Sequence, residues 1–173
     1  MKKLLILTGL MILGACQTTE TYHYPTTKIE RKDYIMNQRF PIIGAVEPVY
    51  VSPISIPFSA RIDTGAEISS IDAQNITPFE RDGEKWVSFD IINRKHNEKY
   101  HFEKPIIRKT KIKRFQHDEH RYVINLNIKI GSEIIENEFS LVNREKFDYQ
   151  ILIGRNIING RFIIDPSVEN TLH

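Results

Sequence analysis

Apolar and polar residues alternate along much of this chain from about residue 42 onward. The clearest case is residues 122–130, where every second residue is apolar. The residues of the apolar face would be Tyr122, Ile124, Leu126, Ile128 and Ile130. A period of two predicts a strand with one buried face. Residues 86–91 alternate in the same way, and Gly131-Ser132 followed by residues 133–142 predicts a hairpin with the first strand.

Shorter apolar runs predict further strands. These runs are residues 42–46 before a turn at Glu47-Pro48, 58–62 leading into Asp63, 149–153 ending at Gly154, and 162–164. Residues 49–56 are interrupted by Pro53, which predicts an edge strand or a loop. One short helix is expected after Gly154, around Ile157 and Ile158. Many short strands separated by turn signals predict an all-β barrel or sandwich.

The first residues have the pattern of a secretory signal. Lys2 and Lys3 precede an apolar run over residues 4–13, which is too short to span a bilayer as a mature helix. The ending Leu-Gly-Ala-Cys resembles a bacterial lipobox, which implies cleavage before Cys16 and lipidation of its thiol. The alternative is an accidental cysteine at the end of an ordinary signal. We therefore expect a signal peptide over residues 1–15, a tether over 16–28 and a folded domain over 29–173.

Charge and the cysteine count agree with this interpretation. Cys16 is the single cysteine, so the chain forms no internal disulfide. Removing Lys2 and Lys3 from the 24 basic residues leaves 22, equal to the 22 acidic residues. Such a balance predicts no nucleic-acid partner. Membrane attachment would come from the lipid. Gln17 after the cysteine favours the outer membrane, with the domain facing the periplasm, under the sorting rule that accompanies the lipobox resemblance.

The candidate chemistry lies in Asp63-Thr64-Gly65. An acid, a small hydroxyl residue and a glycine, entered from an apolar strand, have the layout of half an aspartic-protease site. That chemistry needs two facing carboxylates, one ionised and one protonated. The Thr64 hydroxyl can bond nearby backbone and hold the loop, while Gly65 permits a close backbone approach. The chain has one such triplet, so the second aspartate must come from elsewhere.

Two segments resemble known aspartic proteases. Residues 63–71 resemble the active-site segment of retropepsins, and Ile-Leu-Ile-Gly-Arg-Asn at 151–156 resembles the element near the retropepsin C-terminus. With residues 76–87 and 160–167, the likeness extends to a bacterial family often labelled ATP-dependent zinc proteases and later grouped with retropepsin-like peptidases. It covers nearly everything from about residue 42 to residue 172.

The resemblance implies a closed retropepsin-like β-barrel with one short C-terminal helix. It also implies a homodimeric aspartic endopeptidase that acts on a peptide or protein substrate. Asp63, Thr64 and Gly65 would be catalytic. The residues that would support the cleft or the fold are Ala66, Ser69, Gly154, Arg155 and Asn156.

The residues of this chain give little support for the zinc and ATP dependence that the family label names. The single dense group of metal-ligand types is His-Asp-Glu-His at 117–120, for which an exposed hairpin tip is the simpler interpretation. His96 and His101 are expected to be solvated. The sequence contains neither His-Glu-x-x-His nor a phosphate-binding Gly-x-x-x-x-Gly-Lys loop. We therefore expect neither zinc nor ATP, although a metal-dependent peptidase stays an alternative.

Two further questions concern charge near the candidate site. Arg61 beside Asp63 could hold the acid ionised, which would favour a non-catalytic module that binds peptide or cell-wall material. Lys109, Lys111 and Lys113 would line one face of a strand within the basic segment 104–121. The simpler interpretation is a strand edge that lysines protect from aggregation. The alternative is a flap over the substrate, whose charge would favour acidic peptides or cell-wall carboxylates.

Overall fold

The computed structural model describes residues 40–112 and 119–172. The predicted signal peptide, the tether and Cys16 lie outside the described residues, as do Lys113, His117 and Asp118. Within the described ranges, no helix is long and apolar enough to cross a membrane.

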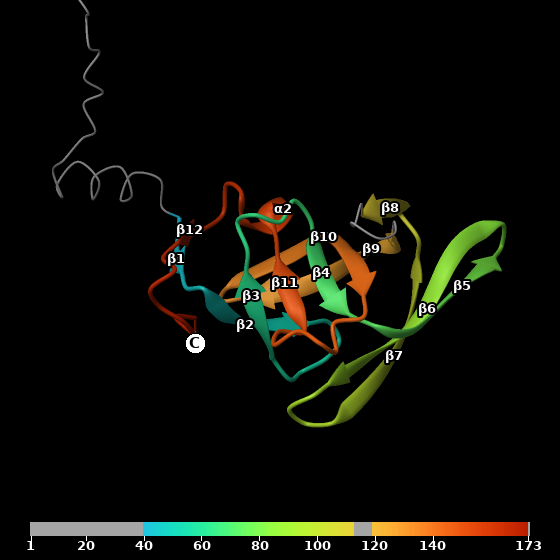
Figure 1. Ribbon diagram of the computed structural model, residues 1–173, viewed down its shortest axis with the longest axis horizontal. Helices are drawn as coiled ribbons and strands as arrows, with labels where there is room; N and C mark the ends of the chain where they lie inside the picture. The colour runs from blue at the N-terminus through green and yellow to red at the C-terminus, as the bar shows by residue number, and fades with distance from the viewer. Residues whose placement is uncertain (1–39, 113–118, 173) are drawn as a thin grey trace, which may run out of the picture. The chain divides into compact units, whose positions relative to one another are not determined.

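Six strands form a closed barrel, which confirms the predicted all-β fold (Figure 1). They are β2 (Val46–Val51), β3 (Phe58–Ile62), β4 (Ser69–Asp72), β9 (Glu119–Ile130), β10 (Glu133–Val142) and β11 (Ile151–Ile153). Their order around the barrel is β10-β4-β11-β3-β2-β9, and the antiparallel pairing of β9 with β10 closes the ring. At the edge of this sheet, β8 (Arg108–Ile112) pairs with β9.

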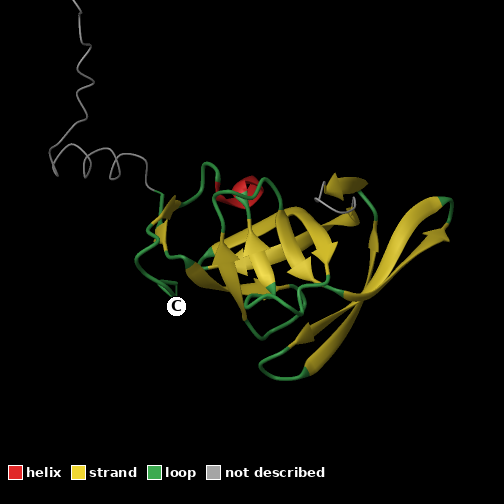
Figure 2. Ribbon diagram, in the orientation of Figure 1, coloured by secondary structure: helices red, strands yellow, loops and turns green. Residues whose placement is uncertain are grey.

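The remaining elements lie outside the closed barrel. β1 (Ile42–Ile43) pairs in parallel with β12 (Ile163–Ile164). The predicted helix is α2 (Arg155–Ile158), and Figure 2 shows how little helix there is beside the strands. A three-stranded sheet of β5 (Gln74–Arg81), β6 (Glu84–Asn93) and β7 (Glu98–Pro105) projects from the barrel (Figure 1). We call this sheet the arm.

The alternation along the long hairpin defines the barrel core. Ile124, Leu126, Ile128 and Ile130 of β9 are at most 1% exposed, as the pattern predicts. Phe139 of β10 and both isoleucines of β11 are fully buried against them. The other predicted alternation, in β6, also holds, because Val87, Phe89 and Ile91 are fully buried. Hydrophobic burial of this kind is the main favourable contribution to folding.

The predicted turn at Glu47-Pro48 is wrong. Both residues lie inside β2, where Pro48 pairs with Ser59 of β3. The second neighbour of β2 is β9, and that pairing begins only at Val49. Pro48 therefore lies where β2 has one partner strand, and its missing N–H costs little there. Pro53 falls in the turn after β2, in agreement with the predicted interruption.

Candidate active site

Asp63 follows β3 directly, at the end of an apolar strand. Its backbone N–H donates to the Ile153 carbonyl at 2.9 Å, which ties the start of the loop to β11. The carboxylate oxygen Oδ1 accepts a hydrogen bond from the Gly65 N–H at 2.8 Å. Asp63 is partly exposed and lines an open pocket of about 470 Å³ together with Arg61 and Thr64. The carboxylate is thus fixed in place and open to solvent.

The two neighbours of Asp63 serve the loop in different ways. A Cβ atom at Gly65 would lie 3.1 Å from Asp63 Oδ1, so a larger residue would crowd the carboxylate. The Thr64 side chain is exposed, and within the described part of one chain its hydroxyl makes no hydrogen bond. Instead, Arg155 Nη1 donates to the carbonyls of Thr64 and Gly65 at 3.1 and 2.7 Å. The guanidinium of Arg155 holds this turn, where we expected the Thr64 hydroxyl to do so.

The second motif, residues 151–156, supports the Asp63 loop through hydrogen bonds between Asn156 and Ser69. Asn156 Oδ1 accepts from the Ser69 N–H at 2.9 Å and from the Ser69 hydroxyl at 2.8 Å. The Gly154 N–H in turn donates to Ser69 Oγ at 3.0 Å. On its other side, Asn156 Nδ2 donates to Asn137 Oδ1 and to the Glu138 carbonyl, at 3.0 and 2.9 Å. One amide therefore joins the Asp63 loop, α2 and β10.

Backbone contact between the two motifs explains the glycine at 154. The Arg155 N–H donates to the Ala66 carbonyl at 2.8 Å. A Cβ atom at Gly154 would lie 2.8 Å from the carbonyl carbon of Ile68 and 3.0 Å from the Ala66 oxygen. These are backbone atoms that cannot turn aside, so position 154 requires glycine. Residues 63–69 and 154–156, which the sequence suggested separately, form one unit.

Arg61 does not pair with Asp63. Both residues line the same pocket, but among the described residues no ion pair joins them within 4.0 Å. The concern that Arg61 clamps the acid in its ionised form therefore has no contact to support it in a single chain.

No metal centre is present in the described part of the chain. Residues 40–112 and 119–172 contain no group of three or more His, Cys, Asp or Glu side chains able to hold an ion. The segment 117–120 is described only from Glu119, where β9 begins. The His101 side chain is 60% exposed and its Nδ1 lies 2.9 Å from Asp90 Oδ1. His96 is exposed in the turn between β6 and β7, as expected of a solvated residue.

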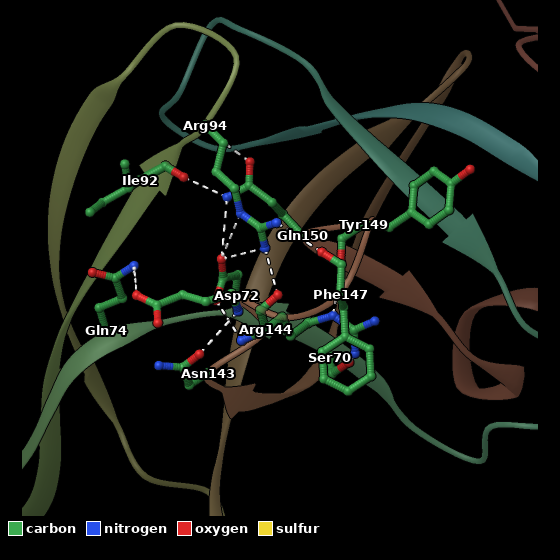
Figure 3. A network of polar contacts seen from close by, with 11 residues as sticks. Ser70, Asp72, Gln74, Ile92, Arg94, Asn143, Arg144, Phe147, Tyr149 and Gln150 are labelled. Carbon is green, nitrogen blue, oxygen red and sulfur yellow. Dashed lines mark hydrogen bonds and ion pairs between the residues drawn. The ribbon is translucent and has the colours of Figure 1, made fainter.

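A buried arginine close to the candidate site was not predicted from the sequence pattern. Arg144 follows β10 and is 7% exposed. Its Nε donates to the Tyr149 carbonyl and its Nη1 to the Ser70 hydroxyl, both at 3.0 Å. Its backbone N–H donates to Asp72 Oδ1 at 2.7 Å, within the network that Figure 3 shows. Burial lowers the pKa of Arg144, while the charge of Asp72 and, more weakly, that of Asp63 raise it. An arginine after an apolar strand is normally exposed, so only the structure reveals this position.

Comparison with known proteins identifies the family. Residues 42–172 match the family described as RimB-like, retropepsin-like aspartic endopeptidase RimB. This chain belongs to the RimB-like family. The match spans the barrel, the arm and both motifs of the candidate site, residues 63–69 and 154–156.

Curated relatives are considerably longer than this chain. A probable alpha-L-glutamate ligase of Shewanella halifaxensis (strain HAW-EB4) is 38% identical over 130 residues, which are 73% of this chain and 28% of the relative. A second, from Desulfotalea psychrophila (strain LSv54 / DSM 12343), is 36% identical over 135 residues, or 76% of this chain and 29% of the relative. The RimB-like chain thus spans less than a third of the length of these relatives.

A solved structure agrees with the fold. The crystal structure of a protein of unknown function from Legionella pneumophila matches with a TM-score of 0.66 and 33% sequence identity. The match covers 76% of this chain and 97% of that protein.

Proposed function

We propose that this RimB-like chain is an aspartic endopeptidase whose active site forms when two copies bring their Asp63 carboxylates together. The observation that carries the proposal is the position of Asp63. It is partly exposed at a strand end, on a loop that is fixed by the second family motif. The sequence contains a single Asp-Thr-Gly, so a second copy is the simplest source of the second acid. Such a dimer would be isologous, with the cleft on its two-fold axis.

The chemistry follows from two like charges in close proximity. Two adjacent carboxylates cannot both be ionised cheaply, so the Asp63 pair would share one proton. The ionised carboxylate would take a proton from a water molecule, whose oxygen attacks the carbonyl carbon of the peptide bond. The protonated carboxyl would donate a hydrogen bond to the carbonyl oxygen. The exposed Thr64 hydroxyl is available to bond across the two-fold axis.

The location is proposed from the sequence alone. Lipidation of Cys16 would anchor the domain to the cell envelope, with the outer membrane as the destination and the periplasm as the working compartment. The substrate would be a peptide or protein. The name of the curated relatives, probable alpha-L-glutamate ligase, makes glutamate-containing peptides the first substrates to test.

The test compares wild type with Asp63→Asn, using the full chain purified in detergent and a peptide library from acidic to neutral pH. We expect Asp63→Asn to lose cleavage by at least about 100-fold, with an unchanged urea midpoint. Asp82→Asn is the matched control, because Asp82 is exposed in the tip of the arm and its positive φ of 53° suits asparagine. Cleavage by Asp63→Asn at the parental rate would show that the mechanism is wrong.

Mixing the two chains tests the shared site. If each site needs two Asp63 carboxylates, an equal mixture with Asp63→Asn leaves about a quarter of the dimers fully wild type after subunit exchange. Activity per wild-type chain should then fall by about half. Activity that stays proportional to the amount of wild-type chain would place the whole site in one chain. A chain that is monomeric at high concentration in sedimentation would favour the non-catalytic binding module instead.

A further inference from the structure

A hollow lies on the outer surface of the barrel, where β2, β9 and β10 are neighbours. Its volume is about 520 Å³. Three residues of its lining form one row across these strands, because Tyr50 of β2 pairs with Lys129 of β9, and Lys129 pairs with Ile134 of β10. The turn after β2 adds Pro53 and Ile54 to the lining. We call this space the outer hollow.

Apolar groups are exposed around the outer hollow. Ile134 is 78% exposed, the highest value among the large hydrophobic residues of the described ranges, and Tyr50 is 37% exposed. Pro53, in the same lining, is exposed as well. A single exposed isoleucine needs no explanation, whereas apolar groups that share one hollow are typical of an interaction surface.

The polar atoms of the outer hollow suit the boundary between water and lipid. Lys129 is the single charged residue of the lining. Its Nζ lies 5.9 Å from the centroid of the Tyr50 ring, and among the described residues no carboxylate lies within 4.0 Å of it. The Tyr50 hydroxyl likewise has no hydrogen-bond partner in residues 40–112 and 119–172. Such side chains can bury their apolar part at the edge of a bilayer and keep their polar tip among the headgroups.

The expected lipid on Cys16 brings a bilayer within reach of this surface. Residues 17–39 separate Cys16 from Phe40, where the described part of the chain begins, and these 23 residues span at most about 80 Å in any conformation. A tethered surface meets the bilayer at a high effective concentration, so a few side chains suffice for a populated contact. This favours a phospholipid bilayer over a partner that must be captured from solution.

The outer hollow and Asp63 lie toward opposite ends of β3. Val49, next to Tyr50, pairs with Phe58 at the start of β3, whereas Asp63 follows Ile62 at its end. The five residues of β3, at about 3.3 Å each, separate the two positions. A bilayer that covers the outer hollow therefore leaves the Asp63 loop turned away from the lipid.

We propose that the outer hollow is a docking surface for a phospholipid bilayer, and that docking holds the anchored domain with its Asp63 loop toward the water. Ile134 and Pro53 enter the boundary between headgroups and acyl chains. Lys129 and the Tyr50 hydroxyl bond to headgroup phosphates. This inference rests on the proposed lipidation of Cys16, and it adds an orientation to the proposed location.

The charge around the outer hollow predicts which lipids it accepts. Glu136 lies two residues after Ile134 on the same exposed face of β10, and it pairs with Asn127 of the lining. Together with Lys129 it gives this surface no net charge. Docking should therefore be driven by apolar burial, and it should occur on neutral phosphatidylcholine as well as on bilayers that contain anionic phosphatidylglycerol.

The test measures how deeply a label enters vesicles of phosphatidylcholine, using the full lipidated chain isolated from bacterial membranes. The fluorophore NBD is attached through Ser132→Cys, two residues before Ile134, or through Asp82→Cys at the arm tip as the reference. Lipid on Cys16 leaves the introduced cysteine as the single free thiol. Bromine on the acyl chains quenches a label that inserts. We expect quenching at position 132 and none at position 82.

Two further substitutions locate the contact. With the label at position 132, Ile134→Gln should lower the ratio of inserted to free label by about tenfold, because one isoleucine side chain no longer leaves water. Ile107→Gln is the matched control, because Ile107 is 48% exposed and lies outside the lining, and it should leave the ratio unchanged. Equal ratios in these two variants would contradict the assignment.

Other outcomes would also overturn the proposal. Equal quenching at positions 132 and 82, or quenching that requires phosphatidylglycerol, would show that apolar burial at the outer hollow does not dock the domain. A dimer in sedimentation that dissociates on Ile134→Gln would assign the hollow to a second copy. Mass spectrometry that finds no lipid on Cys16 would remove the anchor and this inference with it. Peptide cleavage by wild type and Asp63→Asn is measured separately, so the endopeptidase can fail while docking stands, and the reverse.

Discussion

At the scale of single residues, the Asp63 loop depends on one side-chain amide. The side-chain oxygen of Asn156 accepts hydrogen bonds from the Ser69 N–H and hydroxyl. Its side-chain nitrogen donates to the Asn137 side chain and to the Glu138 carbonyl. Ser69 is fully buried, so water cannot replace Asn156 there. A buried donor that loses its acceptor costs far more than the net value of an ordinary hydrogen bond.

We predict that Asn156→Ala lowers the free energy of unfolding by about 2–3 kcal/mol, because it leaves the Ser69 N–H without an acceptor. Urea unfolding measures this loss. Asn159→Ala, at an exposed position after the same helix, should change stability by less than about 0.5 kcal/mol. Equal losses in the two variants would mean that Asn156 does not hold the loop.

At the scale of elements, the sequence predicted strands whose burial follows a simple period. β9 and β6 alternate, β10 follows the turn signal at Gly131-Ser132, and β11 and α2 are marked by an apolar run with Gly154 between them. The sequence pattern does not predict β4, because three of its four residues, Ser69, Ser70 and Asp72, are polar although all four are buried. Several of the hydrogen-bond partners of these polar groups lie more than 70 positions away, such as Arg144 for Ser70 and Asn156 for Ser69. No local pattern reveals such partners.

Long-range contacts also explain why the Asp63 loop and its supporting motif were predicted from the sequence while the buried Arg144 was not. Asp63 and Asn156 lie in contiguous motifs that a sequence displays, so both were identified. Arg144, at the end of β10, donates to Ser70 of β4, which lies 74 positions earlier in the chain, and this contact depends on the closed barrel. The pattern does not predict β5 either, because all of its residues are partly or fully exposed and its hydrophobic periodicity is therefore weak.

A buried carboxylate, that of Glu47 in β2, holds residues 171–172 against this strand. Glu47 is fully buried, and its carboxylate accepts hydrogen bonds from the Gly44 N–H, from the N–H and hydroxyl of Thr171, and from the Leu172 N–H. Burial alone would raise the pKa of Glu47, but the hydrogen bonds from Thr171, Gly44 and Leu172 together lower it below 4.5. The ionised form is therefore favoured in the folded chain.

This pKa shift predicts a pH dependence of stability. A carboxyl whose pKa is lower when folded stabilises the protein above its unfolded pKa of about 4.5, and this contribution is lost as the pH falls through the lower folded value. Glu47→Gln should be less stable at neutral pH and should lose less on acidification. Urea unfolding from neutral pH to about pH 3 tests this. Glu133→Gln, an exposed control, should keep the wild-type profile. A Glu47→Gln profile parallel to that of wild type would remove Glu47 as the cause.

At the scale of the whole folded domain, a polar network joins the arm to the barrel (Figure 3). Arg94, in the turn between β6 and β7, donates to Asp72 Oδ2 at 2.9 Å and to the carbonyls of Arg144 and Phe147 at 2.7 and 2.8 Å. Gln150 links the same regions, because its amide donates to the Ile92 carbonyl and its oxygen accepts from the Arg94 N–H. The inner end of the arm is thereby fastened beside the backbone of Arg144.

We predict that Arg94→Ala lowers the free energy of unfolding by about 2–3 kcal/mol, because the Asp72 side chain, only 4% exposed, would lose its charged partner. Arg81→Ala is the matched control, since Arg81 pairs with Glu103 near the arm tip with both side chains about 40% exposed, and it should cost less than about 1 kcal/mol. Urea unfolding gives both values, and hydrogen exchange of β6 reports whether the arm detaches first. Equal effects of the two substitutions on stability would show that the network does not fasten the arm.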